Sequence, residues 1–452
     1  MILVNMELEK VLFEKNYKTI KKVVLNAFEK SKYYHRIMET VGFDPHEDFT
    51  YEDYKKIPIT DKNLYEANKF DMVTTDLTGF DIEYYNSLKT GYERKNYIAK
   101  WGISSLITSG STGQPLEVIK GISDKQRDYY VLNKYRYKLT DFDFRGKFVW
   151  VWPVNPIIID FFSDGTPETR DIKWESINDE GYIYSIYNHS QEEFEALYSF
   201  IKKEDITWIT SSPTIAYKFA KYIKEKNLKV PDIKYIECHS EKLFDWQKEM
   251  ITEVFKCDIS SVYSSNEVQF IGCKCNCGKM HMFKDNIFAE FVKNDNDISE
   301  VLLTDLNYYD VPLIRYRLGD MGCWSEDQTC LCRLNGTPVF NLEGFRSNDY
   351  VIKPDNTVLE PFVISDSVYL LGNKFSLDIK RNRIEQLAVD HFIYYFDDYI
   401  LKGNVKEYEA FLSDYLERLL MVDVKVEIRL YDDSLTYNCR KFKYFQNKVK
   451  LN

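Results

Sequence analysis

Several patterns that identify common protein classes are missing from this chain of 452 residues. No window approaches the roughly 18 uninterrupted apolar residues that a membrane-spanning helix needs. The first ten residues, MILVNMELEK, include acidic residues and no long apolar run, so we expect no signal peptide. Neither a GK[ST] phosphate loop nor a GxSxG nucleophile elbow occurs. We therefore expect a cytoplasmic protein without membrane segments, which is not a P-loop enzyme.

An excess of basic residues is also missing. The chain has 71 acidic residues against 60 lysines and arginines, which gives a formal net charge of −11. An acidic chain repels phosphate backbones at long range, so nucleic acid is not an expected partner. The nine cysteines are an odd count in a chain for which we expect no leader, which argues against a disulfide framework. No repeat, low-complexity tract or Gly/Ser-rich linker marks a modular array.

The N-terminal part reads as helical. Residues 7–45 show apolar positions at helical spacing, and Gly42 and Pro45 end the pattern. Thr60 is the expected cap of a further short helix. Because 452 residues exceed what one ordinary core serves, two or more domains are expected.

The middle of the chain alternates between strand and helix patterns. The pattern runs through a strand, a loop and a second strand at 103–121, a helix at 123–138, a strand at 149–153, and then helices at 192–203, 213–226 and 243–256 that alternate with strands at 206–210, 233–238 and 258–263. Such alternation predicts βαβ units and a parallel sheet. Residues 284–306 alternate in polarity and are expected to form antiparallel strands.

The last hundred residues read as a smaller α+β domain with its own strands and with helices near 383–396 and 405–420. The predicted fold class is therefore α/β, with a large N-terminal domain that combines parallel and antiparallel strands. We expect this large domain over 1–345 and a small mobile domain over 346–452.

A run of small polar residues follows the first expected strand. It consists of Thr108, Ser109, Gly110, Ser111, Thr112 and Gly113, and Gln114 and Pro115 come next. Glycines let backbone amides approach phosphate oxygens closely, and the hydroxyl groups add hydrogen-bond donors. The run suits a cradle for a triphosphate, although the residues alone fit a polar surface loop equally well.

This run, TSGSTGQP, resembles the signature loop of adenylate-forming enzymes, the superfamily of acyl-CoA synthetases, luciferases and adenylation domains. SKYYHRIM and KKIPITDK resemble the N-terminal region of its phenylacetate–CoA ligase branch, to which capsule-biosynthesis ligases are similar. The family usually has a lysine soon after the second glycine, where Gln114 and Leu116 stand here. The positive charge that stabilises the phosphates must then come from another part of the protein.

Further motifs resemble the family in the same order. YSSNE (263–267) is similar to its aromatic–Gly–x–x–Glu element, which implies that Tyr263 and Ser264 lie near the adenine and that Glu267 binds Mg²⁺. RYRLGD (315–320) resembles the RYRTGD element, which implies that Asp320 accepts hydrogen bonds from the ribose hydroxyls.

Four shorter matches complete the resemblance. HSE (239–241) is similar to an SGE element, which implies that Ser240 and Glu241 line the nucleotide pocket, and Ser212 with Pro213 falls where the family binds its acid. GFRSND (344–349) resembles the hinge element, which implies that Arg346 contacts the nucleotide and that Asn348, or Asp349, is the pivot. RKFKYF (440–445) resembles the ending whose lysine bridges the acyl carboxylate and the α-phosphate, which implies that role for Lys441, with Lys443 second.

Six candidate metal ligands form two groups. Cys273, Cys275 and Cys277 precede His281, and Cys330 and Cys332 follow later. Two thiol groups separated by a loop are a normal zinc arrangement, and the phenylacetate–CoA ligase branch often has a comparable group. We predict one structural Zn²⁺ in an insertion at about 270–335, with Cys275, Cys277, Cys330 and Cys332 as ligands and Cys273 and His281 as alternates. Reduced free cysteines are the alternative.

The resemblance implies ATP-dependent activation of a carboxylic acid, an aryl or other small acid, to an acyl-adenylate. The acyl group would then pass to coenzyme A, a carrier-protein thiol or an amine, and the resemblance also implies a possible homodimer. Two other interpretations remain open: an adenylyltransferase that releases a stable product, and a catalytically degenerate zinc-containing binding protein. The departures at Ser264, Phe345 and Arg440 favour the second of these.

Overall fold

The computed structural model describes residues 2–88, 91–107, 116–152, 174–176, 180–186, 190–240, 243–293, 299–342, 351–355, 357–359, 362–377, 379, 382–431 and 445–449. By its contacts the chain divides into two compact units: Met1–Leu106 with Val118–Phe345, and Ile107–Glu117 with Arg346–Asn452. The predicted mixed α/β class is confirmed, with a large sheet in the first unit and a smaller one in the second. Among the described helices, none has the length and hydropathy that crossing a membrane requires.

The first unit begins with six helices. They are α1 (Ile2–Lys30), α2 (Lys32–Thr40), α3 (Tyr51–Tyr54), α4 (Lys62–Asn68), α5 (Ile82–Ser87) and α6 (Gly91–Ala99). The helical character predicted over 7–45 is confirmed, and it is divided between α1 and α2 because the side chain of Ser31 accepts a hydrogen bond from the Tyr34 amide at 3.3 Å and so caps α2. The cap predicted at Thr60 is wrong, because Asp61 caps α4 and Thr60 instead bridges to Tyr316.

Two strands and a long helix follow. β1 (Ile103–Ile107) and β2 (Glu117–Gly121) form a separate two-stranded sheet, and α7 (Ile122–Leu139) comes directly after β2. Both strands and the helix were expected from the sequence. The strands are therefore placed on either side of the small-residue run 108–115.

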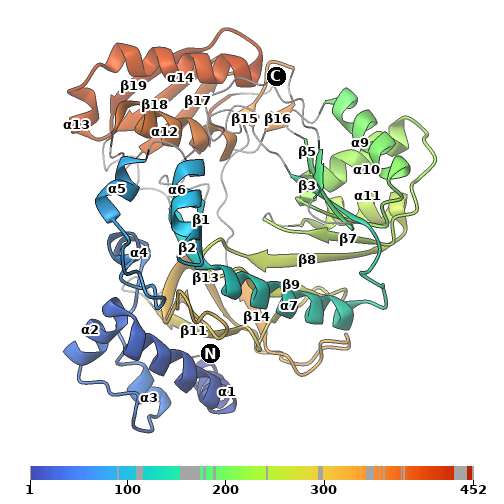
Figure 1. Ribbon diagram of the computed structural model, residues 1–452. Helices are drawn as coiled ribbons and strands as arrows, with labels where there is room; N and C mark the ends of the chain where they lie inside the picture. The colour runs from blue at the N-terminus through green and yellow to red at the C-terminus, as the bar shows by residue number, and fades with distance from the viewer. Residues whose placement is uncertain are drawn as a thin grey trace. The chain divides into compact units, whose positions relative to one another are not determined.

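A sheet of twelve described strands forms the body of the first unit (Figure 1). Its order is β11-β12-β13-β14-β10-β9-β8-β7-β6-β3-β5-β4. The bounds are β3 (Phe148–Trp152), β4 (Trp174–Ser176), β5 (Gly181–Ser185), β6 (Trp208–Ser211), β7 (Tyr235–Cys238), β8 (Asp258–Ser264), β9 (Phe270–Lys274), β10 (Met280–Met282), β11 (Ile287–Lys293), β12 (Ser299–Asp305), β13 (Tyr316–Trp324) and β14 (Val339–Leu342). Strands β5, β3, β6, β7 and β8 run parallel, and their other neighbours pair antiparallel, so both predicted sheet types are confirmed.

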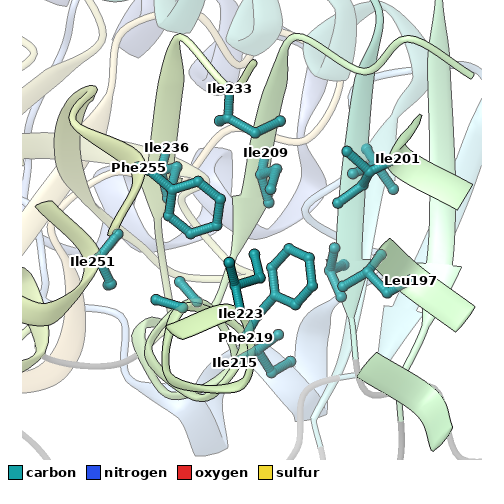
Figure 2. Packing of buried hydrophobic residues seen from close by; sticks show 14 of the residues in the cluster. Leu197, Ile201, Ile209, Ile215, Phe219, Ile223, Ile233, Ile236, Ile251 and Phe255 are labelled. Atoms are coloured by element: carbon teal, nitrogen blue, oxygen red, sulfur yellow. The ribbon is translucent and has the colours of Figure 1, made fainter. Parts of the chain in front are cut away.

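Three helices pack on the parallel strands (Figures 1 and 2). They are α9 (Gln191–Lys203), α10 (Pro213–Glu225) and α11 (Asp245–Phe255), each close to its predicted range. Each presents apolar residues four positions apart, as an amphipathic helix must to bury one face. Figure 2 shows these side chains against the strand residues Ile209 and Ile236; the helical ones are Leu197, Ile201, Ile215, Phe219, Ile223, Ile251 and Phe255. This core fixes the carboxyl ends of β3, β6, β7 and β8 relative to one another.

The second unit is a four-stranded sheet with helices. It contains β15 (Val351–Ile352), β16 (Val358–Leu359), α12 (Phe362–Phe375), β17 (Asn382–Ala388), β18 (His391–Phe396), α13 (Asp398–Leu401), α14 (Val405–Leu420), β19 (Lys425–Leu430) and β20 (Phe445–Asn447). The four-stranded sheet has the order β19-β18-β17-β20. The helix predicted at 405–420 is confirmed as α14, and α12 was not predicted.

The helix predicted near 383–396 is wrong, because this segment is the hairpin β17–β18. Ile384 pairs with Tyr394 of β18 and with Phe445 of β20, so β17 is hydrogen-bonded on both sides. The aromatic and β-branched residues of HFIYYF suit a strand better than a helix. Pairing with β18, and with β20, which is remote in the sequence, outweighed the helical spacing of the apolar residues.

Candidate functional site

Two of the predicted nucleotide-binding residues meet across the sheet. Tyr263 lies at the end of β8, and Asp320 lies in β13. The Tyr263 hydroxyl donates a hydrogen bond of 2.6 Å to Oδ2 of Asp320, although the residues are 57 positions apart in the sequence. Both side chains are partly exposed, so they lie at the surface of the fold rather than inside its core. Ser264 is the last residue of β8 and is also partly exposed.

Glu267 lies close to the same motif. Its Oε1 is 3.5 Å from the hydroxyl of Tyr316, the first residue of β13. The ring of Tyr316 is buried and meets the ring of Tyr65 edge to face at 6.1 Å. Tyr65 in turn accepts a 2.8 Å hydrogen bond from the amide of Ile119 in β2. Glu267 is thus a partly exposed carboxylate against a rigid aromatic wall, which is the kind of oxygen ligand that a hard divalent cation takes.

Arg315, the first residue of RYRLGD, is a structural residue and was not singled out by the sequence analysis. It is buried, has a φ of +50°, and its Nε lies 3.0 Å from Oε2 of Glu290. Its Nη1 also donates to the carbonyl oxygen of Ile57 at 2.6 Å. The guanidinium therefore braces the loop before β13 against the N-terminal segment and against β11.

A group of aromatic rings lies at the carboxyl ends of β3 and β7. The ring of His239 stacks on Trp152 at 5.2 Å and meets Trp150 at 5.8 Å in an edge-to-face contact. Nδ1 of His239 is 2.9 Å from Oγ of Ser240, which has a φ of +72°. Burial lowers the pKa of His239 to about 4, so this imidazole is neutral near pH 7. The tryptophans of VWVW were not singled out beforehand, although two tryptophans on one strand face were a readable signal.

Ser212 belongs to the same edge of the sheet. It follows β6, its Oγ accepts a hydrogen bond from the Ile215 amide, and it caps α10 directly before Pro213. The His239 amide donates to the carbonyl oxygen of Ser211 at 3.0 Å. The ends of β3, β6 and β7 thus meet where ligands bind in open parallel sheets.

Four candidate metal ligands converge in the described part of the chain. The thiols of Cys275, Cys330 and Cys332 and the imidazole of His281 have ligand atoms within 4.8 Å of one another. The Sγ atoms of Cys275 and Cys330 are 3.7 Å apart, and Sγ of Cys332 is 3.3 Å from Nε2 of His281. Tetrahedral zinc with its usual bond lengths places two sulfurs about 3.8 Å apart and a sulfur and a nitrogen about 3.6 Å apart. The donor set and its spacing therefore fit Zn²⁺.

This grouping changes the favoured ligand set. His281, an alternate in the sequence prediction, is in the group, whereas Cys277 is exposed and outside it, although its thiol interacts with those of Cys330 and Cys275. The reason is the strand pairing: β10 places His281 in the sheet, and its Nδ1 lies 2.8 Å from Oγ1 of Thr337, which turns Nε2 toward Cys332.

Cys273, the other alternate, also lies outside the group. It is buried among apolar side chains of α7 and its neighbours, such as Val131 and Leu132. Burial raises the pKa of its thiol, which suits a core residue.

Several predicted site residues lie outside the described residues. These are Thr108, Ser109, Gly110, Ser111, Thr112, Gly113, Glu241, Arg346, Asn348, Asp349, Lys441 and Lys443. Their roles stay predictions.

No protein-family model matches the chain, and no curated protein matches it. Solved structures do match. With 2-hydroxyisobutyryl-CoA ligase in complex with 2-HIB-AMP and CoA, in the thioesterification state, the TM-score is 0.57 at 14% identity over 98% of this chain and 90% of that one. The chain shares the fold of this ligase. An open conformation of the same enzyme with the same ligands gives a TM-score of 0.51 at 15% identity, over 91% of this chain and 86% of that one.

A third structure of that enzyme, in the postadenylation state with 2-HIB-AMP, gives a TM-score of 0.52 at 15% identity over 95% and 88% of the two chains. At such identities the likeness concerns the fold. It confirms the predicted α/β architecture of a large domain followed by a small one.

Proposed function

We propose that this protein is an ATP-dependent acid ligase that forms an acyl-adenylate. The observation that carries the proposal is the pairing of Tyr263 with Asp320 beside Glu267, at the end of β8. These three residues were assigned to nucleotide and metal from motifs alone, and the motifs are distant in the sequence. The fold is that of a ligase whose structures hold an acyl-AMP and CoA.

In this proposal each residue has one task. Asp320 accepts hydrogen bonds from the ribose hydroxyls while it accepts one from Tyr263, since a carboxylate offers about four acceptor sites. Glu267 is the protein ligand of Mg²⁺, which supplies positive charge to the phosphate oxygens when it is bound. Thr108–Gly113 contact the departing phosphates, with Ser264, Ser240 and Glu241 near the base.

Two residues of the hinge and small domain complete the proposed reaction. Lys441 stabilises negative charge where the acid attacks the α-phosphate, and Arg346 contacts the nucleotide. Rotation of 346–452 about Asn348 then removes Lys441 and admits the acceptor. These assignments rest on the motif resemblance.

The acid is proposed to be an aryl or other small acid. What supports this class is the ring cluster of Trp150, Trp152 and His239 beside Ser212. A planar acid gains from offset or edge contacts with such rings. Because His239 is neutral, the ring cluster has no positive charge that would attract a second carboxylate group on the acid. The proposed acceptor is coenzyme A, with a carrier-protein thiol or an amine as the other candidates.

We further propose one structural Zn²⁺ bound by Cys275, His281, Cys330 and Cys332. The fit of their spacing to a tetrahedral site supports it. Four protein ligands would fill the tetrahedral coordination of the ion and leave no position open for a substrate. The ion would therefore have a structural role, in which it links β9 and β10 to the 330–332 turn.

Pyrophosphate exchange into ATP tests the ligase function. We expect exchange to require Mg²⁺ and an added carboxylic acid, found by screening aryl, fatty and amino acids. Glu267→Gln and Asp320→Ala should each lower the rate at least about 100-fold. Glu225→Gln and Asp232→Ala, which change exposed acidic residues, are the matched controls.

Four results would contradict the assignments. Pyrophosphate exchange that needs no added acid would contradict the proposed activation of a carboxylic acid. Wild-type exchange rates in both Glu267→Gln and Asp320→Ala would contradict the roles assigned to these two residues. A stable adenylylated product that no thiol consumes would favour an adenylyltransferase. Absence of ATP uptake by calorimetry would favour the binding-protein alternative.

A further inference from the structure

Lys120, in β2, is an unusual lysine because it is buried. Its side chain is only 1% exposed, and its Nζ donates a short hydrogen bond to the hydroxyl of Tyr308. Lysine is almost never fully buried unless its charge is paired. Nothing in the proposed reaction uses this residue, so its burial calls for a separate explanation.

The hydroxyl of Tyr308 is the centre of a hydrogen-bond network. It donates to Oδ2 of Asp128 in α7 at 2.6 Å. It also accepts, at 3.4 Å, from the amide of Gln269, which follows Glu267 by two residues. The network therefore runs from the strand after the small-residue run to the backbone beside the proposed metal ligand.

Without Lys120, the buried groups around it would include carboxyl groups that have no positive charge opposite them. Asp128 and Asp305 are fully buried carboxyls, and both act on Lys120 electrostatically, as does Glu267. Oδ1 of Asp305 accepts from the amides of Asn307 and Tyr308 at 2.7 and 3.0 Å. Oδ2 of Asp305 has no hydrogen-bond partner among the described atoms. One ammonium group thus faces three carboxyl groups.

The titration of these groups agrees with that picture. Burial lowers the pKa of Lys120, and the three carboxyls oppose this shift. Burial raises the pKa of Asp128 and of Asp305, and the charge of Lys120 opposes both shifts. Each side therefore favours the charged form of the other, and removal of the ammonium group leaves buried carboxyls without their counter-charge.

We propose that Lys120 is a positioning residue of the nucleotide site, whose buried charge offsets the carboxyls beside Glu267 and whose bond to Tyr308 fixes the backbone at Gln269. MgATP carries a net negative charge, so it approaches these carboxyls favourably only while Lys120 is present. Lys120 itself touches neither nucleotide nor acid, because its ammonium group is enclosed. This inference rests on the proposed function, since it assumes that MgATP binds at Glu267.

Calorimetric titration of the full chain with MgATP tests the inference. In Lys120→Met, which keeps the length and apolar stem of the side chain, we expect the Kd for MgATP to rise about tenfold. Tyr308→Phe should raise it by a smaller factor, because it breaks the network but keeps the charge. Lys138→Met, which removes an exposed lysine of the same helix α7, is the matched control and should match wild type.

A double variant separates charge from packing. Lys120→Met with Asp128→Asn removes the ammonium group together with one of the buried carboxyl groups that act on it, so it should recover part of the lost MgATP affinity. It should also fold if Lys120→Met alone does not. A residue with only a packing role would show no such recovery. In exchange assays, the KM for the acid should stay at its wild-type value in every variant that folds.

The inference about Lys120 and the proposed function are overturned by different results. Wild-type MgATP affinity in Lys120→Met overturns the inference alone, as does a double variant that binds MgATP no better than Lys120→Met. A rise in the KM for the acid equal to the rise in Kd for MgATP overturns it too, because the effect would then be general. A wild-type chain that takes up no MgATP overturns the proposed function and this inference together.

Discussion

The hydroxyl of Tyr263 donates a 2.6 Å hydrogen bond to Oδ2 of Asp320, and this bond joins the end of β8 to β13. It fixes the carboxylate that is proposed to bind ribose. A tyrosine next to a nucleotide site can place its ring on the base and its hydroxyl on a neighbouring acceptor. The motif resemblance implied only the first task for Tyr263, and the structure adds the second contact.

Tyr263→Phe should weaken MgATP binding about fivefold to tenfold, because it removes one hydrogen bond to a charged group and keeps the ring. The KM for the acid should not change. Tyr130→Phe, at a residue that is 73% exposed, is the control. Equal MgATP affinity in Tyr263→Phe, Tyr130→Phe and wild type would show that the Tyr263–Asp320 bond does not support the nucleotide.

Metal analysis should find about one zinc per chain. Cys332→Ser and His281→Gln should lose it and should melt at a lower temperature, because the proposed ion would link strands to a turn. Cys277→Ser and Cys257→Ser should keep it. Loss of zinc from Cys277→Ser together with retention in His281→Gln would restore the ligand set that the sequence favoured.

Glu9 in α1 should make stability depend on pH. Burial raises its pKa from 4.5 to about 7, while its carboxyl accepts hydrogen bonds from the Phe291 amide and the Tyr51 hydroxyl, both at 2.8 Å. The native state holds this proton more tightly than the unfolded state does. Its stabilising contribution is therefore complete below pH 4.5 and is lost as the pH rises toward 7.

Urea unfolding at pH 5 and pH 8 measures this effect. Wild type should lose up to about 3 kcal/mol more stability over that interval than Glu9→Gln, which cannot ionise. Glu7→Gln, at an exposed position of the same helix, should keep the wild-type pH dependence. Parallel pH profiles for wild type and Glu9→Gln would contradict the assignment.

The buried pair of Arg315 and Glu290 should be essential for stability. Arg315→Met leaves Glu290 without its partner inside the protein, so the free energy of unfolding should fall by about 3–5 kcal/mol. Arg145→Met breaks an exposed pair with Asp143 and should cost less than about 1 kcal/mol. Similar urea midpoints for the two variants would show that Arg315 does not brace the loop.

The sequence by itself determined the elements whose signal is local. Apolar residues four apart set α9, α10 and α11, and short apolar runs between them set β6, β7 and β8. This alternation was enough to predict a parallel sheet, and the motif resemblance was enough to predict the fold class. It also named Tyr263 and Asp320 before their contact was visible.

Only the tertiary structure decided the features that depend on remote partners. The segment 383–396 became a hairpin because β17 bonds to β18 and β20 on its two sides. His281 joined the cysteine group because strand pairing and Thr337 orient it. The buried environment of Lys120 came from α7 and from the segment around Tyr308. A spacing along the chain reports which face a residue occupies, but the identity of the group opposite it is set by how distant segments pack.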